Sequence, residues 1–368
     1  MEKSASSHLG KLQVVDLVRT FAILSVMAYH MYGMAPPGPP LIWFWQPLAE
    51  NGVYGVWIFF VVSGFLITRI IDGGEDKLFK PNFKEFYVRR AARILPLLFL
   101  HILVGAYMIH NVTQFGLLFW ASLFTFTYNW YQAFFPNPVP GLYWGMLWSL
   151  SVEEQFYFFY PPLLRRLGRQ KKLLIFMLSF IVIGFFWRSG FLLNSAESPI
   201  FFYKTSFGAF DQIAIGVLLY LAVKRYRAYL SAHQGLGFFL CALGLLITAG
   251  TYFFTNSNKQ VDDIYSPATV AVGTFLFILG GLHLPFFESK YCRFLTWTGK
   301  YSYGIYLFHS LIYYFIYTSL LKDRNIVVAF AIFATMSTII MAFSYHLFEV
   351  PTNRFIRRIF GVKTSVGN

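Results

Sequence analysis

The stretch RRLGRQKKLLIFMLSFIVIGFFWRSGFL at 165–192 decides the class of fold. Its first eight residues, 165–172, form a basic cluster, and residues 173–192 then form an apolar run that contains a single charge, Arg188. A run of about 20 apolar residues is the length that an α-helix needs to cross the hydrocarbon core of a bilayer. Lys and Arg beside such a run are typical of its cytoplasmic end. The stretch therefore predicts a transmembrane helix that begins at the cytoplasmic face.

The composition of the whole chain extends this prediction. Of the 368 residues, 57% are hydrophobic and 12% are charged, whereas a soluble domain carries about 25% charged residues. The 24 Tyr and 9 Trp residues can supply the aromatic belts at the membrane interfaces. In a soluble protein a net charge of +14 would suggest nucleic acid, but here it indicates basic cytoplasmic loops and polyanionic ligands or lipids, with no nucleic-acid partner.

Further apolar runs of similar length occur along the chain. There are eleven in all: 14–33, 53–71, 92–110, 115–131, 146–164, 173–192, 207–223, 235–254, 266–286, 301–321 and 327–348. The predicted fold class is therefore all-α, a polytopic membrane protein formed by a single transmembrane domain over 1–368. The chain ends about 20 residues after the last run, so we expect no appended soluble domain.

Basic segments set the expected topology. The segments 77–93, 165–172, 224–227 and the C-terminal tail all belong in the cytoplasm by the positive-inside rule, so an even number of crossings must separate each pair. Three runs lie between 93 and 165, and one of them cannot cross. The run 115–131 is followed by an uncharged stretch rich in Pro, Asn, Tyr and Trp, which favours a re-entrant or surface-lying element at 113–145 on the outer side. About ten transmembrane helices remain, with both termini cytoplasmic.

Two ionisable residues share one face of the first predicted helix. Arg19 and His30 are eleven residues apart, which at 100° per residue is three turns plus about 20°. At 1.5 Å per residue they are separated by about 16 Å along the axis, with Arg19 toward the cytoplasm. Asp16 lies one turn before Arg19 and can pair with it. Intramembrane charges suggest function, although snorkelling of Arg19 and a simple polar role for His30 are open alternatives.

A pair of carboxylates lies in the outer half of the run 146–164. Glu153 and Glu154 fall near the expected depth of His30, and a carboxylate beside a histidine can orient its tautomer and raise its basicity. We therefore expect Glu153 to orient His30. The alternative is an ordinary helix N-terminus, where the helix dipole favours acidic residues.

Three arginines open the helix that contains the run 92–110. Arg90 and Arg93 are one turn apart, so that together with Arg89 they could bind one polyanion. The alternative is a basic flank with no ligand. Asp211, His309 and Glu349 are further ionisable residues in or beside predicted spans, although a lone polar residue there more often bonds a neighbouring helix.

Motifs for other classes of site are missing from the sequence. It contains no Walker loop, no GxGxxG, no paired CxxC and no HExxH. Neither a metal site nor a nucleotide-binding fold is expected.

These segments, in this order, resemble the membrane-bound acyltransferase 3 family over nearly the whole chain. The motifs that carry the resemblance are R-x10-H at Arg19 and His30, GVWIFFVVSGFLIT at 55–68, FYVRRAARILP at 86–96, WSLSVEEQFY at 148–157, DQIAIG at 211–216, TGKYSYGIYLFH at 298–309 and FEVP at 348–351. The chain departs from the family's frequent residues at Leu17, Trp57 and Lys300, the second of which stands where many members have Asp.

The resemblance implies an enzyme that moves an acetyl group from acetyl-CoA to a hydroxyl group of a carbohydrate or another small acceptor. It implies catalytic roles for His30 and Glu153 and binding of the donor by Arg19, Arg89, Arg90 and Arg93. Supporting roles are expected for the remaining polar residues of the motifs, Asp16, Glu154, Tyr157, Asp211 and His309. A bacterial cytoplasmic (inner) membrane is the implied location.

Several functions remain open from the sequence alone. Our first hypothesis is acetylation of a cell-surface glycan or lipid-linked glycan, such as lipopolysaccharide O-antigen, with membrane lipids around the protein. A small hydroxylated acceptor resembling a macrolide is the second. A transporter of a glycan or acyl intermediate is the third, although the chain shows no repeated halves of the kind many transporters have.

Overall fold

The computed structural model describes residues 12–34, 45–73, 77–108, 115–135, 144–190, 199–254, 259–321 and 325–362. Every regular element within these ranges is a helix. A bilayer requires this or a closed barrel, because backbone groups in hydrocarbon must bond within the protein. The elements are α1 (Gln13–Met34), α2 (Trp45–Glu50), α3 (Tyr54–Asp72), α4 (Phe83–Met108), α5 (Leu117–Phe124), α6 (Tyr128–Phe134), α8 (Leu147–Leu167), α9 (Gln170–Arg188), α10 (Pro199–Lys204), α11 (Ser206–Ala232), α12 (Gln234–Phe254), α13 (Lys259–Gly281), η2 (Pro285–Glu288), α14 (Lys290–Leu295), α15 (Trp297–Lys300), α16 (Ser302–Ile316), η3 (Tyr317–Leu321), α17 (Ile326–Ser344), η4 (Tyr345–Glu349) and α18 (Val350–Ile359).

Eight stretches of helix in the described chain are long and apolar enough to cross a membrane. They lie in α1, α3, α4, α9, α11, α12, α13 and the continuous run from α17 to α18. Each coincides with one of the ten predicted crossings. The other two predicted crossings also form helices, α8 and α16. However, α8 carries Glu153 and Glu154 in its first half, and α16 has only 15 residues before the π-helical turn η3.

The excluded apolar run 115–131 does not form one long helix. It is divided between α5, with 8 residues, and α6, with 7 residues. Between them the chain turns at Phe126, whose φ of 55° lies in the left-handed region. Neither helix is long enough to cross a bilayer, which needs about 20 residues. The expected placement on the outer side stays a prediction.

Close backbone contact joins α3 to α11 at the centre of the protein. A Cβ atom at Gly64 would lie 2.0 Å from the carbonyl oxygen of Ile213, and one at Gly216 would lie 2.0 Å from that of Val61. Only glycine permits this approach, and small residues are common where transmembrane helices pack. The motifs around 64 and 211–216 therefore have a packing role.

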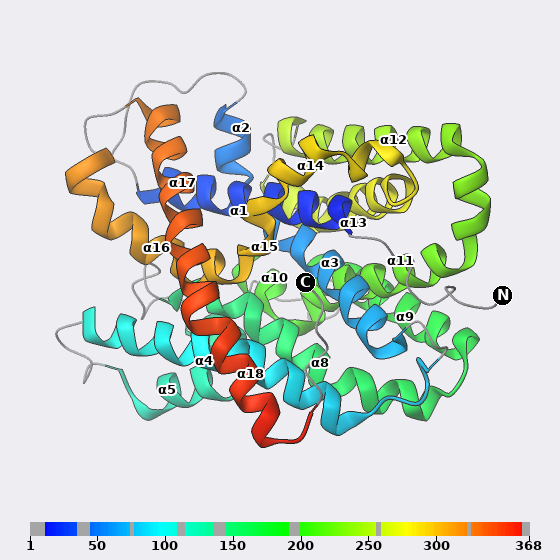
Figure 1. Ribbon diagram of the computed structural model, residues 1–368, viewed down its shortest axis with the longest axis horizontal. Helices are drawn as coiled ribbons and strands as arrows, with labels where there is room; N and C mark the ends of the chain where they lie inside the picture. The colour runs from blue at the N-terminus through cyan, green and yellow to red at the C-terminus, as the bar shows by residue number, and fades with distance from the viewer. Residues whose placement is uncertain are drawn as a thin grey trace.

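Figure 1 shows how the helices are arranged in space. The helix α11 packs against α3 and α9, while α1 packs against α3, α15 and α16. The helices α17 and α18 follow one another as a long run, drawn orange to red, and α18 packs against α4. This arrangement brings the first turns of α4, the first two turns of α1 and the start of α18 to one region.

Candidate active site

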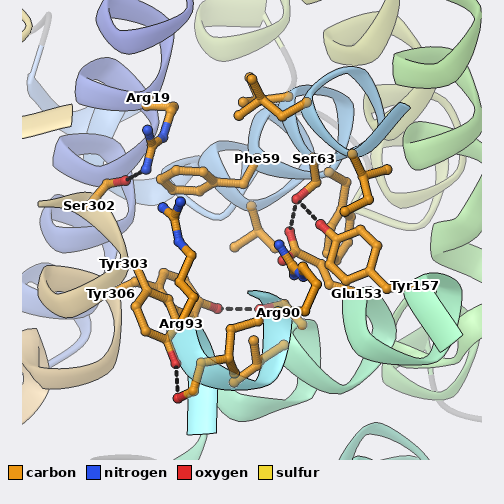
Figure 2. A pocket seen from close by; sticks show the side chains of 18 of the residues that line it. Arg19, Phe59, Ser63, Arg90, Arg93, Glu153, Tyr157, Ser302, Tyr303 and Tyr306 are labelled. Atoms are coloured by element: carbon orange, nitrogen blue, oxygen red, sulfur yellow. Dashed lines mark hydrogen bonds between the residues drawn. The ribbon is translucent and has the colours of Figure 1, made fainter. Parts of the chain in front are cut away.

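A cavity of about 140 Å³ lies between α1, α3, α4, α8 and α16. Each of these helices contributes polar side chains to the wall, as Figure 2 shows. They include Arg19 of α1, Ser63 of α3, Arg90 and Arg93 of α4, and Glu153 of α8. Four of these five are residues that the sequence singled out. The cavity is smaller than a typical pocket for a whole small molecule, which is about 300–1,000 Å³, so it suits the end of a long ligand.

A wider cleft of about 910 Å³ adjoins this cavity. The side chains that line both spaces are Arg19, Ile70, Arg90, Arg93 and Tyr303. Three arginines therefore mark the junction at which the wide space narrows. The other walls of the cleft come from the start of α4, from Lys300 and from η4 and α18.

Two of the three predicted arginines of α4 already have carboxylate partners on the protein. Arg89 pairs with Glu85 on its own helix, and Arg90 donates to Glu154 Oε1 at 2.8 Å. The guanidinium of Arg90 also lies 3.9 Å from the centre of the Tyr157 ring. Its Nε atom is buried, without an acceptor in the described chain. Arg90 is therefore held rigidly while one donor stays unused.

Arg19 and Arg93 point into the cavity from different helices (Figure 2). Arg19 donates to Ser302 Oγ at 2.9 Å and to Asp16 Oδ1 at 3.3 Å. Arg93 forms no ion pair with any residue that the structure describes. Two cations that share a small space with only partial compensation favour an anionic ligand.

Glu153 does not pair with His30, contrary to our expectation. Its Oε1 atom accepts a hydrogen bond of 2.7 Å from Ser63 Oγ, and Tyr157 donates its hydroxyl to the same Ser63. Ser63 lies on α3, and Tyr157 lies one turn after Glu153 on α8 itself. The side chain of Glu153 therefore bonds within this group and not with the His30 ring on α1. Glu153 thus belongs to the cavity wall.

His30 is instead bonded to His309 of α16. The Nδ1 atom of His30 lies 2.9 Å from the carbonyl oxygen of Val26 and 3.1 Å from Nε2 of His309. The Nδ1 atom of His309 lies 2.8 Å from the carbonyl oxygen of Tyr306. Because a carbonyl only accepts, both Nδ1 atoms carry hydrogen in the neutral rings. The one hydrogen on Nδ1 of His30 is then shared between the carbonyl oxygen of Val26 and Nε2 of His309, which both accept. This arrangement leaves Nε2 of His30 as the nitrogen that can accept a proton.

The histidine pair lies just beyond the end of the cavity. Neither His30 nor His309 belongs to its lining, whereas Tyr306 does. The Tyr306 ring lies 6.1 Å from that of His309 and 6.1 Å from that of Phe59. The Tyr306 hydroxyl bonds Ser149 Oγ and donates to the carbonyl oxygen of Met146 at 2.9 Å. The space that begins at the arginines therefore ends at Tyr306 and does not reach His30.

Asp211 lies outside both spaces. It forms a two-point ion pair with Arg188, at 3.0 and 2.8 Å, and both side chains are 1% exposed. Arg188 also donates to the carbonyl oxygens of Gly208 and Ile264. This cluster joins α9, α11 and α13. It gives Asp211, the acidic residue of the DQIAIG motif, a structural role in helix packing.

Sequence reasoning missed several residues of the site. Ser63, Ser302 and Tyr306 lie within the quoted motifs, but a hydroxyl group in a span gives no signal of its own. Arg354 and Arg357 were interpreted only as part of a basic cytoplasmic tail, whereas the structure places both in the wall of the cleft. Their spacing of three residues, one helical turn, was the available signal.

Comparison with known proteins identifies the family to which this chain belongs. The family model described as "Acyltransferase domain", acyltransferase 3, matches residues 12–346. The chain is 29% identical over 390 residues to YrhL of Bacillus subtilis, with 96% of this chain and 58% of that protein covered. It is 27% identical over 386 residues to the peptidoglycan O-acetyltransferase OatA of Listeria monocytogenes, with 95% and 57% covered.

A third relative is closer to this chain in length. Nodulation protein 10 of Rhizobium leguminosarum is 28% identical over 333 residues, which cover 85% of this chain and 86% of that protein. By contrast, the chain spans a little over half of YrhL and OatA. No solved structure matches the chain significantly.

Proposed function

We propose that this chain, which belongs to the acyltransferase 3 family of multi-pass membrane proteins, transfers an acetyl group from acetyl-CoA to a hydroxyl group of a cell-surface carbohydrate. The observation that carries the proposal is the arginine-lined cleft that narrows into a cavity below the His30–His309 pair. A long polyanionic donor whose reactive end is small and uncharged matches that shape.

The proposed topology has ten crossings, including α8 and α16, with both termini in the cytoplasm. The basic flanks support it, because Arg165 and Arg166 end α8 and Lys171 and Lys172 begin α9. In this orientation the start of α4 and the wide cleft face the cytoplasm, where acetyl-CoA is available. The segment 113–145 would then lie on the outer side, near the acceptor.

Arg19, Arg90 and Arg93 would hold the diphosphate of the donor at the junction of the two spaces. Arg93 has no carboxylate partner in the described chain, and Arg90 retains a buried Nε donor, so both can bind a phosphate oxygen. The pantetheine arm then enters the cavity, past Ser63 and Glu153. Glu153 and Glu154, with Tyr157, fix the positions of these groups and limit the positive charge beside the thioester.

His30 would act as the general base through Nε2. The proton of the acceptor hydroxyl moves to this nitrogen, the new C–O bond forms at the acetyl carbonyl carbon, and the C–S bond breaks to release the thiolate of coenzyme A. His309 is a positioning residue, because it accepts from the opposite nitrogen of His30. Since the cavity lining ends at Tyr306, a shift of this ring is needed to bring the thioester and His30 together.

The acceptor class rests on the relatives. OatA is named as a peptidoglycan O-acetyltransferase, which supports a carbohydrate of the cell envelope. Peptidoglycan and lipopolysaccharide O-antigen are the two acceptors to test first, and a small hydroxylated metabolite is the alternative.

The test compares cells that express the wild-type chain with cells that express His30→Ala at the same level. Mass spectrometry of the envelope carbohydrates should show an added acetyl group in the wild type only. Removal of a general base costs about 10²–10⁴-fold, so the variant should lose at least about hundredfold in acetylation. The exposed His233, at the end of α11, gives the control His233→Ala. Equal acetylation by His30→Ala and the wild type would refute the mechanism, and a pool of acetylated small metabolites without acetylated glycan would refute the acceptor class.

A further inference from the structure

The helix α18 extends the last transmembrane run beyond the bilayer. The run Ile326–Ile359 has 34 residues, which at 1.5 Å per residue is about 51 Å. The hydrocarbon core is only about 30 Å thick. The final turns must therefore project into the interface or the water, on the side where α4 begins, because α18 packs against α4.

The two faces of α18 have different chemistry. The face that lines the cleft consists of Val350, Asn353, Arg354 and Arg357, with the i, i+3, i+4, i+7 spacing of one helical stripe. On the opposite face Phe355 is 63% exposed and Ile359 is 62% exposed. An apolar outer face in this position suits the membrane interface, and it directs the two arginines toward the cleft.

The cleft carries more positive charge than its own carboxylates compensate. The cations that line it are Arg19, Arg89, Arg90, Arg93, Lys300, Arg354 and Arg357, and the carboxylates are Asp16 and Glu349. Glu85 and Glu154 do not line the cleft, but they pair with Arg89 and Arg90. Arg354 forms no ion pair with the residues that the structure describes. Arg357 lies within electrostatic range of Arg89, which repels it, and of Glu85, which attracts it. An anion between α4 and α18 would relieve this repulsion.

We propose that Arg354 and Arg357 form a separate subsite for the 3′-phosphate of coenzyme A. The inference rests on the proposed function, and it follows from the shape of the site. If the pantetheine arm occupies the narrow cavity and the diphosphate lies at its entrance, the nucleotide remains in the wide cleft. The ribose 3′-phosphate is the remaining dianion of the donor, and guanidinium groups bind such a group through paired hydrogen bonds.

An anionic lipid headgroup offers the same phosphate chemistry to an interfacial helix. The test therefore uses the purified full chain in nanodiscs of phosphatidylcholine alone and, in a second arm, with phosphatidylglycerol added. In each arm the affinities of coenzyme A and of 3′-dephospho-coenzyme A are measured by isothermal titration calorimetry. The variants are Arg354→Gln with Arg357→Gln, and, as a matched control on the same helix, Arg358→Gln, which does not line the cleft.

The wild type in phosphatidylcholine should bind coenzyme A at least about tenfold more tightly than the dephospho form, the size expected for charge-assisted hydrogen bonds. The double variant should lose this preference while its affinity for the dephospho form is unchanged, and Arg358→Gln should keep the preference. Equal affinities of the wild type for both compounds would overturn the subsite, as would an equal loss in Arg358→Gln. An effect of the double variant seen only with phosphatidylglycerol would identify a lipid site instead. If the wild type bound neither compound, the proposed function itself would fail.

Discussion

The Nε2 atom of His309 lies 3.1 Å from the Nδ1 atom of His30, so that imidazoles from α16 and α1 form one polar unit. The contact joins residues 279 positions apart in the sequence. Together with the carbonyl oxygen of Val26, it fixes hydrogen on Nδ1 of His30 and leaves Nε2 available as a base. We therefore expect the two histidines to have different roles: His30 takes the proton, and His309 holds the His30 ring in position.

Replacing His309 tests this division. His309→Leu removes the acceptor but leaves the Val26 carbonyl, so we expect a loss of about tenfold in kcat, with KM for acetyl-CoA unchanged. This loss is smaller than the about 10²–10⁴-fold expected for removal of the general base itself. His309→Gln keeps an oxygen that can accept from His30 and should recover part of the loss. Both values can be measured with labelled acetyl-CoA and purified protein in nanodiscs. Equal activity of the leucine variant and the wild type would remove His309 from the site, and a raised KM would place it in donor binding.

Variants of the ion pair between Arg90 and Glu154 can distinguish the contribution of Arg90 to stability from its contribution to donor binding. Their side chains are 19% and 15% exposed and bond at 2.8 Å. Glu154→Met should destabilise the fold by about 3–5 kcal/mol, because it leaves a largely buried cation unpaired. The double variant Arg90→Met, Glu154→Met should regain most of that stability, but its affinity for acetyl-CoA should remain lower than that of the wild type.

Thermal unfolding and equilibrium binding of acetyl-CoA would be measured on the same samples. A double variant that binds the donor like the wild type would show that Arg90 serves the fold alone.

The ion pair between Arg188 and Asp211 should behave differently, because it lies outside the cavity and the cleft. Asp211→Leu alone should cost about 3–5 kcal/mol in the free energy of unfolding. Arg188→Leu combined with Asp211→Leu should recover part of this loss, although the carbonyl oxygens of Gly208 and Ile264 then lack their donor. The activity of the folded fraction should equal that of the wild type. A fully folded double variant without acetyl transfer would instead return Asp211 to the active site.

Eight of the ten crossings predicted from the sequence form helices long and apolar enough to span a membrane, and the reasons are physical. A span requires about 20 apolar residues and basic flanks mark its inner end, so both signals are local. Arg19, Arg90 and Arg93 line one space because each lies within the first three turns of its own helix. The division of 115–131 into two short helices was consistent with its exclusion as a crossing.

The sequence could not supply the partners within the site. Lipid-facing and core-facing side chains of a span are both apolar, so periodicity does not show which face of α16 meets α1. The contact of His30 with His309 rather than with Glu153 depends on that packing. The same limit applies to α18, where Arg354 and Arg357 line the cleft and Arg358 does not. In the sequence alone the three belong to one basic tail.

Packing of α3 against α11 gives a last prediction. A Cβ atom at Gly216 would lie 2.0 Å from the carbonyl oxygen of Val61 and 2.9 Å from the amide nitrogen of Phe65. Both are backbone atoms, so relief requires movement of a whole helix, and Gly216→Ala should destabilise the protein by about 1–3 kcal/mol. Gly250→Ala, in α12, is the matched control because a Cβ atom there has no neighbour within 4 Å. Thermal unfolding in one detergent should give a lower midpoint for Gly216→Ala and an unchanged or higher one for Gly250→Ala. Since α3 also carries Ser63 and Phe59 into the cavity, the folded fraction of Gly216→Ala should lose acetyl transfer as well. Equal midpoints for the two variants would mean that α3 and α11 are not held in contact at this point.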